Sequence, residues 1–228
     1  MVAGPRAVIF DFDGVIADDE PLHLAAFQRA LSGEGIALTT EDYYAHYLGC
    51  DDHDAIAEAL GAAGRPASEE RVQGLMAIKA THFLGLVRDG VRIFPGVPGF
   101  VGEAAARVPL AIASGALRRE IELILAQSGL RRAFTVIVSA DEVEEGKPSP
   151  AGFLLALARL REQLPDLAST ECLVVEDSLA GIEAARRAGM RCLAVANSYG
   201  PAELAAADLV VPSLEGLGWE RITTLFGS

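Results

Sequence analysis

Two carboxylates at the end of an apolar run constrain this chain more than any other feature of its sequence. The run Ala7–Phe10 is followed by Asp11, Asp13 and Gly14. An unbroken apolar run is typical of a strand covered on both faces, and open α/β sheets bind ligands at the carboxyl ends of their strands. Two anions a few ångströms apart repel each other by about 1 kcal/mol in water and by more at lower dielectric. The pair therefore indicates a site for a cation, a shared proton or both.

Similar apolar runs recur along the chain between segments with helical patterns. The six expected strands are Ala7–Phe10, Leu110–Ala113, Val136–Val138, Cys172–Val175, Cys192–Val195 and Leu209–Val211. The helices expected among them cover about 97–107, 117–128, 150–163, 179–188, 201–206 and 214–226. This alternation predicts βαβ units and an α/β fold with a doubly wound parallel sheet.

The stretch 16–92 breaks the alternation. It contains no convincing strand, and helical patterns separated by glycines and a proline fill it. They cover Leu22–Gly33, Glu41–Tyr47, His53–Ala63 and Glu69–Val87. We therefore expect a core domain formed by 1–15 and 93–228, and an all-helical domain of 16–92 inserted after the first strand. Because the insert leaves and re-enters beside Asp11 and Asp13, it is expected to close over that edge as a cap.

The composition limits the partners that the chain can take. A net charge of −13 over 228 residues disfavours a nucleic-acid surface, which needs a basic footprint, and an anionic membrane surface. No apolar run approaches the length of a membrane span, and no signal peptide is visible. The three cysteines, Cys50, Cys172 and Cys192, form no CxxC pair and favour a reducing cytoplasm. A small molecule is the expected partner, and the oligomeric state stays open.

Ser114 and Gly115 follow the strand Leu110–Ala113, at the expected start of a helix. A serine hydroxyl and the free backbone N–H groups at such a start can bind an anion. Lys147 comes shortly after another expected strand, and Pro148 biases its backbone toward an extended conformation. A serine in this place alone is more often a helix cap, and a lysine alone is more often solvated.

Glu176 and Asp177 place two more acids at a strand end. Because the carboxyl ends of parallel strands share one edge of the sheet, these acids are expected near Asp11 and Asp13. Several carboxylates together suit Mg²⁺, which prefers hard oxygen ligands and is completed by water or substrate phosphate. The acids alone could be turn or capping residues, but their joint occurrence with Ser114 and Lys147 is far more specific.

These groups fit phosphoryl transfer. Lys147 would offset negative charge and keep the nucleophile ionised. Asp11 would attack phosphorus as a covalent nucleophile while cations neutralise the phosphoryl oxygens. Asp13 would protonate the leaving oxygen and then deprotonate water.

The chain resembles the haloacid dehalogenase-like superfamily over nearly its whole length, and the insert is similar to the C1 cap of the group that contains β-phosphoglucomutase and phosphoglycolate phosphatase. The four motifs appear in order as Asp11-Phe12-Asp13-Gly14-Val15, Ser114-Gly115, Lys147-Pro148 and Glu176-Asp177. The resemblance implies a Rossmann-like core with strand order 5-4-1-2-3 and an aspartyl-phosphate at Asp11. It also implies Mg²⁺ at Asp11, the Asp13 carbonyl and Asp177, with Glu176 close by.

The resemblance also assigns residues outside the four motifs. His23 matches a position near the cap and core junction, and it is either a site residue or an ordinary helix histidine. Lys79 matches a cap lysine, with a solvated helix face as the alternative. The mutases of this group carry a cap arginine that grips a second phosphate, and Asp52 falls near its place here. Arg118, after the second motif, could compensate in part for that missing arginine.

The sequence therefore predicts a Mg²⁺-dependent phosphatase acting on a small phosphate monoester, such as a sugar phosphate or a phosphoglycolate-like metabolite. A phosphomutase with the same core is the first alternative, and a non-catalytic phosphate-binding protein is the second. The catalytic residues are Asp11, Asp13 and Lys147, and the metal ligands come from Asp11, Asp13, Glu176 and Asp177. The substrate-binding residues are Ser114, Gly115, His23, Lys79 and Arg118.

Overall fold

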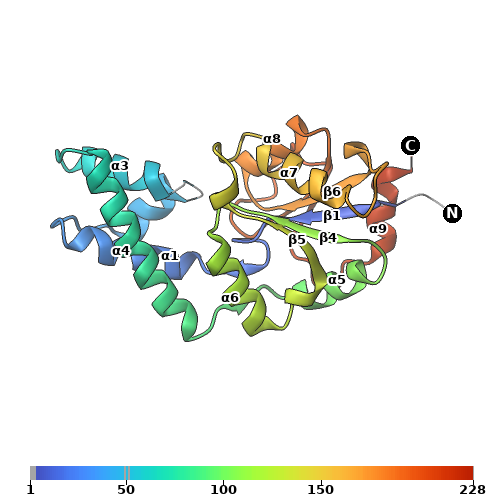
Figure 1. Cartoon of the computed structure of the whole chain (residues 1–228), viewed down its shortest axis with the longest axis horizontal. Helices are drawn as coiled ribbons and strands as arrows, with labels where there is room; N and C mark the ends of the chain where they lie inside the picture. Colours follow the sequence, from blue (N-terminus) through green and yellow to red (C-terminus); the bar gives the residue numbers. More distant parts are fainter. Residues whose placement is uncertain (1–3, 49, 51, 228) are drawn as a thin grey trace. The chain divides into compact units, whose positions relative to one another are not determined.

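A computed structural model describes residues 4–48, 50 and 52–227 of the chain, which form two compact units (Figure 1). Unit 1 comprises Met1–Asp18 and Arg92–Ser228, and unit 2 comprises Asp19–Val91. Unit 1 extends past the expected bounds of 15 and 93 because of two short strands that the sequence pattern does not show. These strands, β2 (Ala17–Asp18) and β3 (Arg92–Ile93), pair antiparallel with each other.

Unit 1 is built on a parallel sheet, which among the described residues has six strands in the order β5-β4-β1-β6-β7-β8. The strands are β1 (Ala7–Phe10), β4 (Leu110–Ala113), β5 (Phe134–Val138), β6 (Cys172–Glu176), β7 (Arg191–Val195) and β8 (Leu209–Val211). Counted along the chain, this is the predicted order 5-4-1-2-3, with the sixth strand added beside the fifth. The predicted α/β fold class is confirmed.

Helices cover both faces of this sheet. They are α5 (Val97–Ala105), α6 (Arg118–Ser128), α7 (Ala151–Leu160), α8 (Leu179–Arg187) and α9 (Trp219–Thr223). Helices α7 and α8 pack on one face, where alternate strand residues such as Ile9 and Val174 join Phe153 in one buried cluster. Helices α5, α6 and α9 lie on the other face (Figure 1), where the ring of Phe10 meets that of Phe100 at 6.1 Å. Double coverage explains why the strands read as unbroken apolar runs.

Unit 2 is helical, as the pattern of its sequence predicts. Its helices are α1 (Glu20–Ser32), α2 (Thr40–Asp42), α3 (Asp52–Ala62) and α4 (Glu69–Arg88), with a π-helical turn at Tyr43–Tyr47. Its own apolar cluster includes Phe27, Ile56, Leu60 and Leu75. No helix formed by the described residues of either unit combines the length and apolar character that crossing a membrane requires.

The C-terminal helices are shorter than the sequence pattern suggests. Residues 201–206 form successive turns rather than the expected helix. The helix expected over 214–226 is limited to α9, followed by a short 3₁₀ turn at Thr224–Phe226. Gly216 and Gly218 interrupt the earlier part of that range, and Gly216 takes a positive φ that does not continue a helix.

Gly96, at the start of α5, should be intolerant of a side chain. Its φ is +83°, and a Cβ atom there would lie 2.2 Å from the backbone nitrogen of Glu215. Gly129, at the end of α6, has a similar φ of +74° but open space around it. Gly129→Ala therefore meets only the left-handed backbone cost of about 1–2 kcal/mol, whereas Gly96→Ala adds a backbone clash. We expect urea denaturation to give the lower midpoint for Gly96→Ala, and equal midpoints would contradict this assignment.

Candidate active site

Three carboxylates from two adjacent strands meet at the carboxyl edge of the sheet in unit 1. Asp11 follows β1, and its N–H donates to the carbonyl of Val175 at 2.9 Å, which continues the pairing of β1 with β6. Glu176 ends β6, and Asp177 comes next. One oxygen from each of these three acids lies within 4.8 Å of the others, and all three side chains are buried. The structure thus brings together acids that are far apart in the sequence.

Lys147 supplies positive charge to this cluster. Its Nζ atom lies 2.7 Å from Oδ1 of Asp11 and 2.5 Å from Oε1 of Glu176. Although burial lowers the pKa of Lys147, the charges of Asp11 and Glu176 outweigh it and hold the pKa above its ordinary value. The side chain is therefore a permanent cation that joins the ends of two strands.

Glu176 is fixed by the start of the following helix. Its Oε2 atom accepts hydrogen bonds from the N–H groups of Asp177 at 2.9 Å and Ser178 at 3.0 Å, and from the Ser178 hydroxyl at 2.9 Å. Gly181 makes room for it, since a Cβ atom at this position would lie 1.8 Å from Oε1. The positive end of α8 and Lys147 together compensate for burying this charge.

Asp177 is fixed by Gly14 and by a segment that the sequence analysis missed. Gly14 has a φ of +76°, and a Cβ atom on it would lie 2.0 Å from Oδ2 of Asp177. Ser198 donates to the same oxygen, and Asn197 donates from Nδ2 to the Gly14 carbonyl at 2.7 Å. Asn197 and Ser198 come just after β7, so polar residues at the end of an expected strand were the signal that could have found them.

Burial and, after it, charge repulsion disfavour the ionised forms of Asp11 and Asp177. Burial, together with the charges of Glu176 and Asp13, raises the pKa of Asp11 to about 7, against the opposing effect of Lys147. Burial and the charges of Glu176 and Asp11 also raise the pKa of Asp177. A divalent cation among these oxygens would offset that repulsion, and an all-oxygen donor set suits a hard cation. The residues present therefore fit a metal ion of this kind.

Asp13 and Ser114 lie in the loops that follow β1 and β4. Asp13 is half-buried, and its backbone forms an isolated bridge with Ala17. Ser114 is buried, its N–H donates to the Val138 carbonyl at 3.1 Å, and its hydroxyl accepts from the N–H of Ala116 at 2.9 Å. Gly115, which lies between Ser114 and Ala116, is exposed. The structure fixes where these backbones lie, and the catalytic and binding roles of the residues stay predictions.

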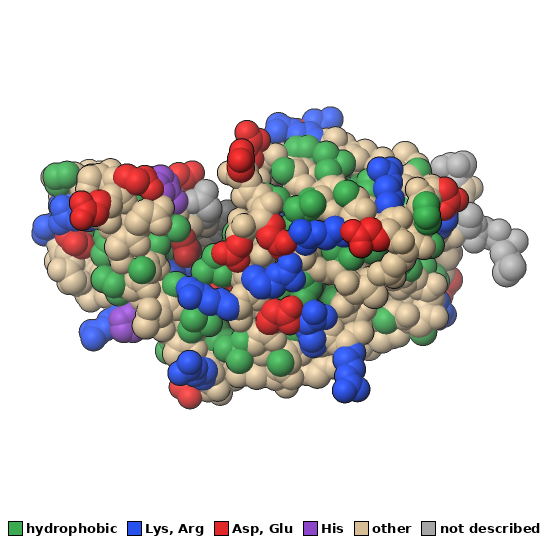
Figure 2. Space-filling view, in the orientation of Figure 1, with side chains coloured by type: hydrophobic (Ala, Val, Ile, Leu, Met, Phe, Trp, Pro, Cys, Tyr) green, Lys and Arg blue, Asp and Glu red, His purple; other side chains and the backbone are tan. Residues whose placement is uncertain are grey.

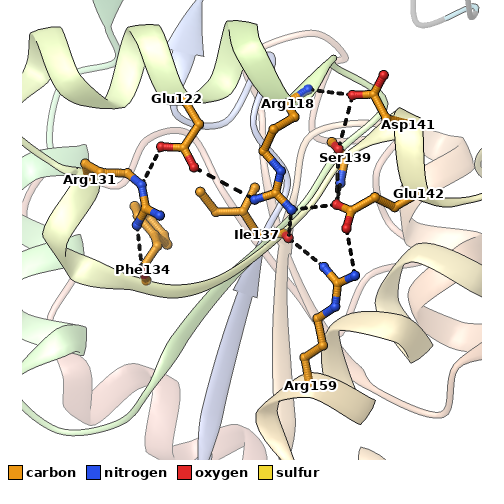
Figure 3. Close-up of polar contacts among 9 residues, drawn as sticks. All are labelled: Arg118, Glu122, Arg131, Phe134, Ile137, Ser139, Asp141, Glu142 and Arg159. Atoms are coloured by element: carbon orange, nitrogen blue, oxygen red, sulfur yellow. Dashed lines mark hydrogen bonds and ion pairs between the residues drawn. The ribbon is translucent and has the colours of Figure 1, made fainter.

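Arg118 makes its contacts at the end of β5. Its Nη2 atom donates to the Ile137 carbonyl at 2.7 Å and to Oε2 of Glu142 at 2.6 Å (Figure 3). The guanidinium is thus engaged by protein acceptors, and its expected contact with substrate stays a prediction.

His23 and Lys79 come together inside unit 2. The side chain of Lys79 is only 2% exposed, so the alternative of a solvated helix face is wrong. Its Nζ atom lies 2.7 Å from Nδ1 of His23 and 2.8 Å from Oδ1 of Asp52. Burial and the neighbouring charge of Lys79 lower the pKa of His23 well below its ordinary value. A neutral imidazole that accepts from the Lys79 ammonium explains this arrangement.

A surface cavity of about 510 Å³ lies at the opposite edge of the unit 1 sheet. Arg191 and Cys192 at the amino end of β7, Thr170 before β6 and Phe226 near the end of the chain help to line it. None of the acids of the cluster lines this cavity. The convergence of charged groups, rather than the volume of this cavity, therefore locates the candidate site.

Known proteins are similar to this chain over most of its length. A family model described as haloacid dehalogenase-like hydrolase matches residues 8–195. Protein CbbY from Rhodobacter capsulatus is 31% identical, with 96% of this chain and 98% of that protein covered. Fructose-1-phosphate phosphatase YqaB from Escherichia coli K12 is 33% identical, with 80% of this chain and 92% of that protein covered.

Solved structures of CbbY from Rhodobacter sphaeroides are also similar. They are complexes with phosphate and, for a mutant, with xylulose-(1,5)bisphosphate. Each is 29% identical to this chain with a TM-score of 0.83, and the match covers 94% of this chain and 96% of that one.

A divalent cation bound by these carboxylates should stabilise unit 1. Binding at a concentration about 100 times Kd contributes about 2.7 kcal/mol, enough to raise Tm by several degrees in a protein of this size. We expect Mg²⁺ to raise Tm in differential scanning calorimetry, EDTA to reverse the rise, and Asp177→Asn to abolish most of it. Asp208→Asn, which removes an acid paired with Arg191, is the control. An equal rise in the wild type and Asp177→Asn would contradict binding at this cluster.

Proposed function

We propose that this chain hydrolyses a small phosphate monoester with the help of Mg²⁺. The chain belongs to the haloacid dehalogenase-like hydrolase family and is one of its phosphatases. The observation that supports the proposal most directly is the meeting of Asp11, Glu176 and Asp177 with Lys147 at one edge of the sheet. A carboxylate beside a fixed cation and further acids is the arrangement that phosphoryl transfer through an aspartate needs.

Mg²⁺ would be held by Asp11, the backbone carbonyl of Asp13 and Asp177, with Glu176 close by. Bound there, it would neutralise charge on the phosphoryl oxygens. Asp11 is the proposed nucleophile. Lys147, 2.7 Å from its Oδ1 atom, orients the carboxylate and favours its ionised form against the repulsion of its neighbours.

The reaction would proceed in two displacements at phosphorus. In the first, a carboxylate oxygen of Asp11 bonds to phosphorus, the ester P–O bond breaks, and the leaving oxygen takes a proton from Asp13. In the second, Asp13 takes a proton from water, the water oxygen bonds to phosphorus, and the bond to Asp11 breaks. Inorganic phosphate is released, and both carboxyl groups return to their starting states.

The loop after β4 is the proposed phosphate-binding element. Ser114 and Gly115 lie between the strand end and α6, where a hydroxyl and backbone N–H groups can meet an anion. His23 and Lys79 are proposed to contact the rest of the substrate, a phosphorylated metabolite such as a sugar phosphate. The three free thiols suit a reducing cytoplasm, where we place the enzyme.

A phosphomutase remains the alternative to be tested, and one observation favours hydrolysis. A mutase of this group needs a cation that holds a second phosphate. In unit 2, the Lys79 ammonium is already paired with Asp52 at 2.8 Å, so a second phosphate would have to compete with a carboxylate. A non-catalytic phosphate-binding protein is disfavoured because Asp11, Asp13, Lys147 and Asp177 are all present.

Phosphate release should depend on Asp11 and on Mg²⁺. With p-nitrophenyl phosphate as substrate, we expect Asp11→Asn to lower kcat by a factor of about 10⁴ or more, as expected when a covalent nucleophile is removed. Mg²⁺ removal by EDTA should have a comparable effect that added Mg²⁺ reverses. Asp208→Asn should match the wild type. Equal rates for the wild type and Asp11→Asn would rule out the proposed function.

The products formed from a hexose 1-phosphate distinguish a phosphatase from a phosphomutase. We expect ³¹P and ¹³C NMR to show inorganic phosphate and free sugar, because water is the proposed second acceptor. A hexose 6-phosphate that forms after priming with a bisphosphate would instead identify a mutase.

A further inference from the structure

At the carboxyl end of strand β5, two arginines bind a backbone carbonyl on the outer side of the strand. In the described sheet β5 is an edge strand, so the carbonyls on its outer side have no strand partner. The Ile137 carbonyl accepts from Nη2 of Arg118 at 2.7 Å and from Nη1 of Arg159 at 3.0 Å (Figure 3). Arg118 begins α6, and Arg159 lies in the last turn of α7. One carbonyl therefore connects the edge strand to two helices.

Glu142 joins these two arginines. Its Oε2 atom lies 2.6 Å from Nη2 of Arg118, and its Oε1 atom lies 2.7 Å from Nη2 of Arg159. The N–H of Ser139 also donates to Oε2 at 3.1 Å. Burial acts to raise the pKa of Glu142, but the bonds from Arg159, Ser139 and Arg118 lower it to about 2. Figure 2 shows such acidic and basic side chains intermingled on this face of unit 1.

The turn that carries Glu142 also holds the loop of Ser114. The N–H of Ala140 donates to the Ala116 carbonyl at 3.0 Å, and Oδ2 of Asp141 accepts from the N–H of Arg118 at 2.9 Å. The loop from Ser114 to the start of α6 is thus attached to the turn through the backbone carbonyl of Ala116 and the backbone N–H of Arg118.

The same turn leads directly to Lys147. Four residues lie between Glu142 and Lys147 along the chain, and α7 begins shortly after Lys147, at Ala151. Because Glu142 binds Arg159 on α7, its carboxylate ties the segment before Lys147 to the helix after it. Glu142 is therefore connected to both loops that deliver the cation and the predicted phosphate-binding serine to the site.

We propose that Glu142 is a positioning residue. Through Arg118 and Arg159, it holds the loops of Ser114 and Lys147 in place relative to Asp11. This inference rests on the proposed function, because it assigns those loops to phosphate binding and catalysis. Without the carboxylate, two guanidiniums that share the Ile137 carbonyl would repel each other. The start of α6 and the end of α7 would then move apart.

Glu142→Gln tests the inference because it keeps the size of the side chain and removes its charge. A misplacement of about 1 Å in a site can cost as much as 100-fold in rate, so we expect kcat to fall by at least about 10-fold. We also expect inhibition by inorganic phosphate to weaken. If Arg118 instead binds substrate directly, removal of its partner would free the guanidinium and strengthen phosphate inhibition. That result would overturn the proposal.

Substitution of the two arginines, one at a time, should distinguish the contributions of the two loops to kinetics. Arg118→Met is expected to raise KM and the inhibition constant of phosphate with little change in kcat, because it loosens the Ser114 loop. Arg159→Met is expected to lower kcat with little change in KM, because it loosens the Lys147 loop. Should Glu142→Gln fail to fold, these variants carry the test, and an identical effect of both on KM and kcat would contradict it.

Glu34→Gln is the matched control. Glu34 also pairs with two arginines, Arg71 and Arg65, and the hydrogen bond from Arg71 holds its pKa below the ordinary value. These three residues belong to unit 2, whereas both loops belong to unit 1, so we expect wild-type kinetics. A loss equal to that of Glu142→Gln would show that any arginine-paired glutamate has this effect, and the proposal would fail.

A measurement that needs no turnover separates this proposal from the proposed function. The sequence contains two lysines, Lys79 and Lys147, so ¹⁵N labelling of lysine gives two Nζ signals that Lys79→Arg assigns. We expect the Lys147 signal to shift in Glu142→Gln and Arg159→Met and to keep its wild-type position in Glu34→Gln. An unchanged Lys147 signal in the first two variants would refute the inference even if no substrate is hydrolysed.

Discussion

The mutual repulsion of Asp11, Glu176 and Asp177 is the constraint on which the rest of unit 1 depends. Three buried carboxylates with oxygens within 4.8 Å of one another destabilise a fold unless positive charge or hydrogen-bond donors offset them. Lys147 contacts two of the acids, the start of α8 donates to Glu176, and Ser198 donates to Asp177. A cluster maintained at such cost in stability is more readily explained by chemistry than by packing.

The close approach of the Asp177 and Glu176 carboxylates to neighbouring backbone requires glycines, which have no side chain, as well as compensating charges. Gly14 and Gly181 stand where a Cβ atom would lie 2.0 Å and 1.8 Å from carboxylate oxygens of Asp177 and Glu176. The two glycines lie on different segments, so the carboxylates occupy space that the backbone leaves open on both sides. This tight fit limits how far Asp177 can move to relieve repulsion, and it favours neutralisation by a bound cation.

The strands and the acids of the site could be predicted from the sequence, but the short strands and tertiary contacts that support them could not. Runs such as Ala7–Phe10 are unbroken because they are covered on both faces, and polar residues at their ends are conspicuous. The two-residue strands β2 and β3 are too short to give a periodicity, and 201–206 has helical composition without helical geometry. Contacts such as Glu142 with Arg159 depend on tertiary packing, since charged surface residues have no pattern that reveals their partners.

The distribution of cations follows the same logic. The sequence has 19 lysines and arginines, yet lysine occurs only at positions 79 and 147, and both side chains contact carboxylates in largely buried places. An ammonium is a compact charge that can lie between two acids, as Lys147 lies between Asp11 and Glu176. A guanidinium is a planar fork suited to several acceptors at once, as Arg118 and Arg159 show by binding a carbonyl and a carboxylate together. At this edge of the sheet, Lys147 therefore concentrates charge between two acids, whereas Arg118 and Arg159 each bind acceptors on neighbouring segments.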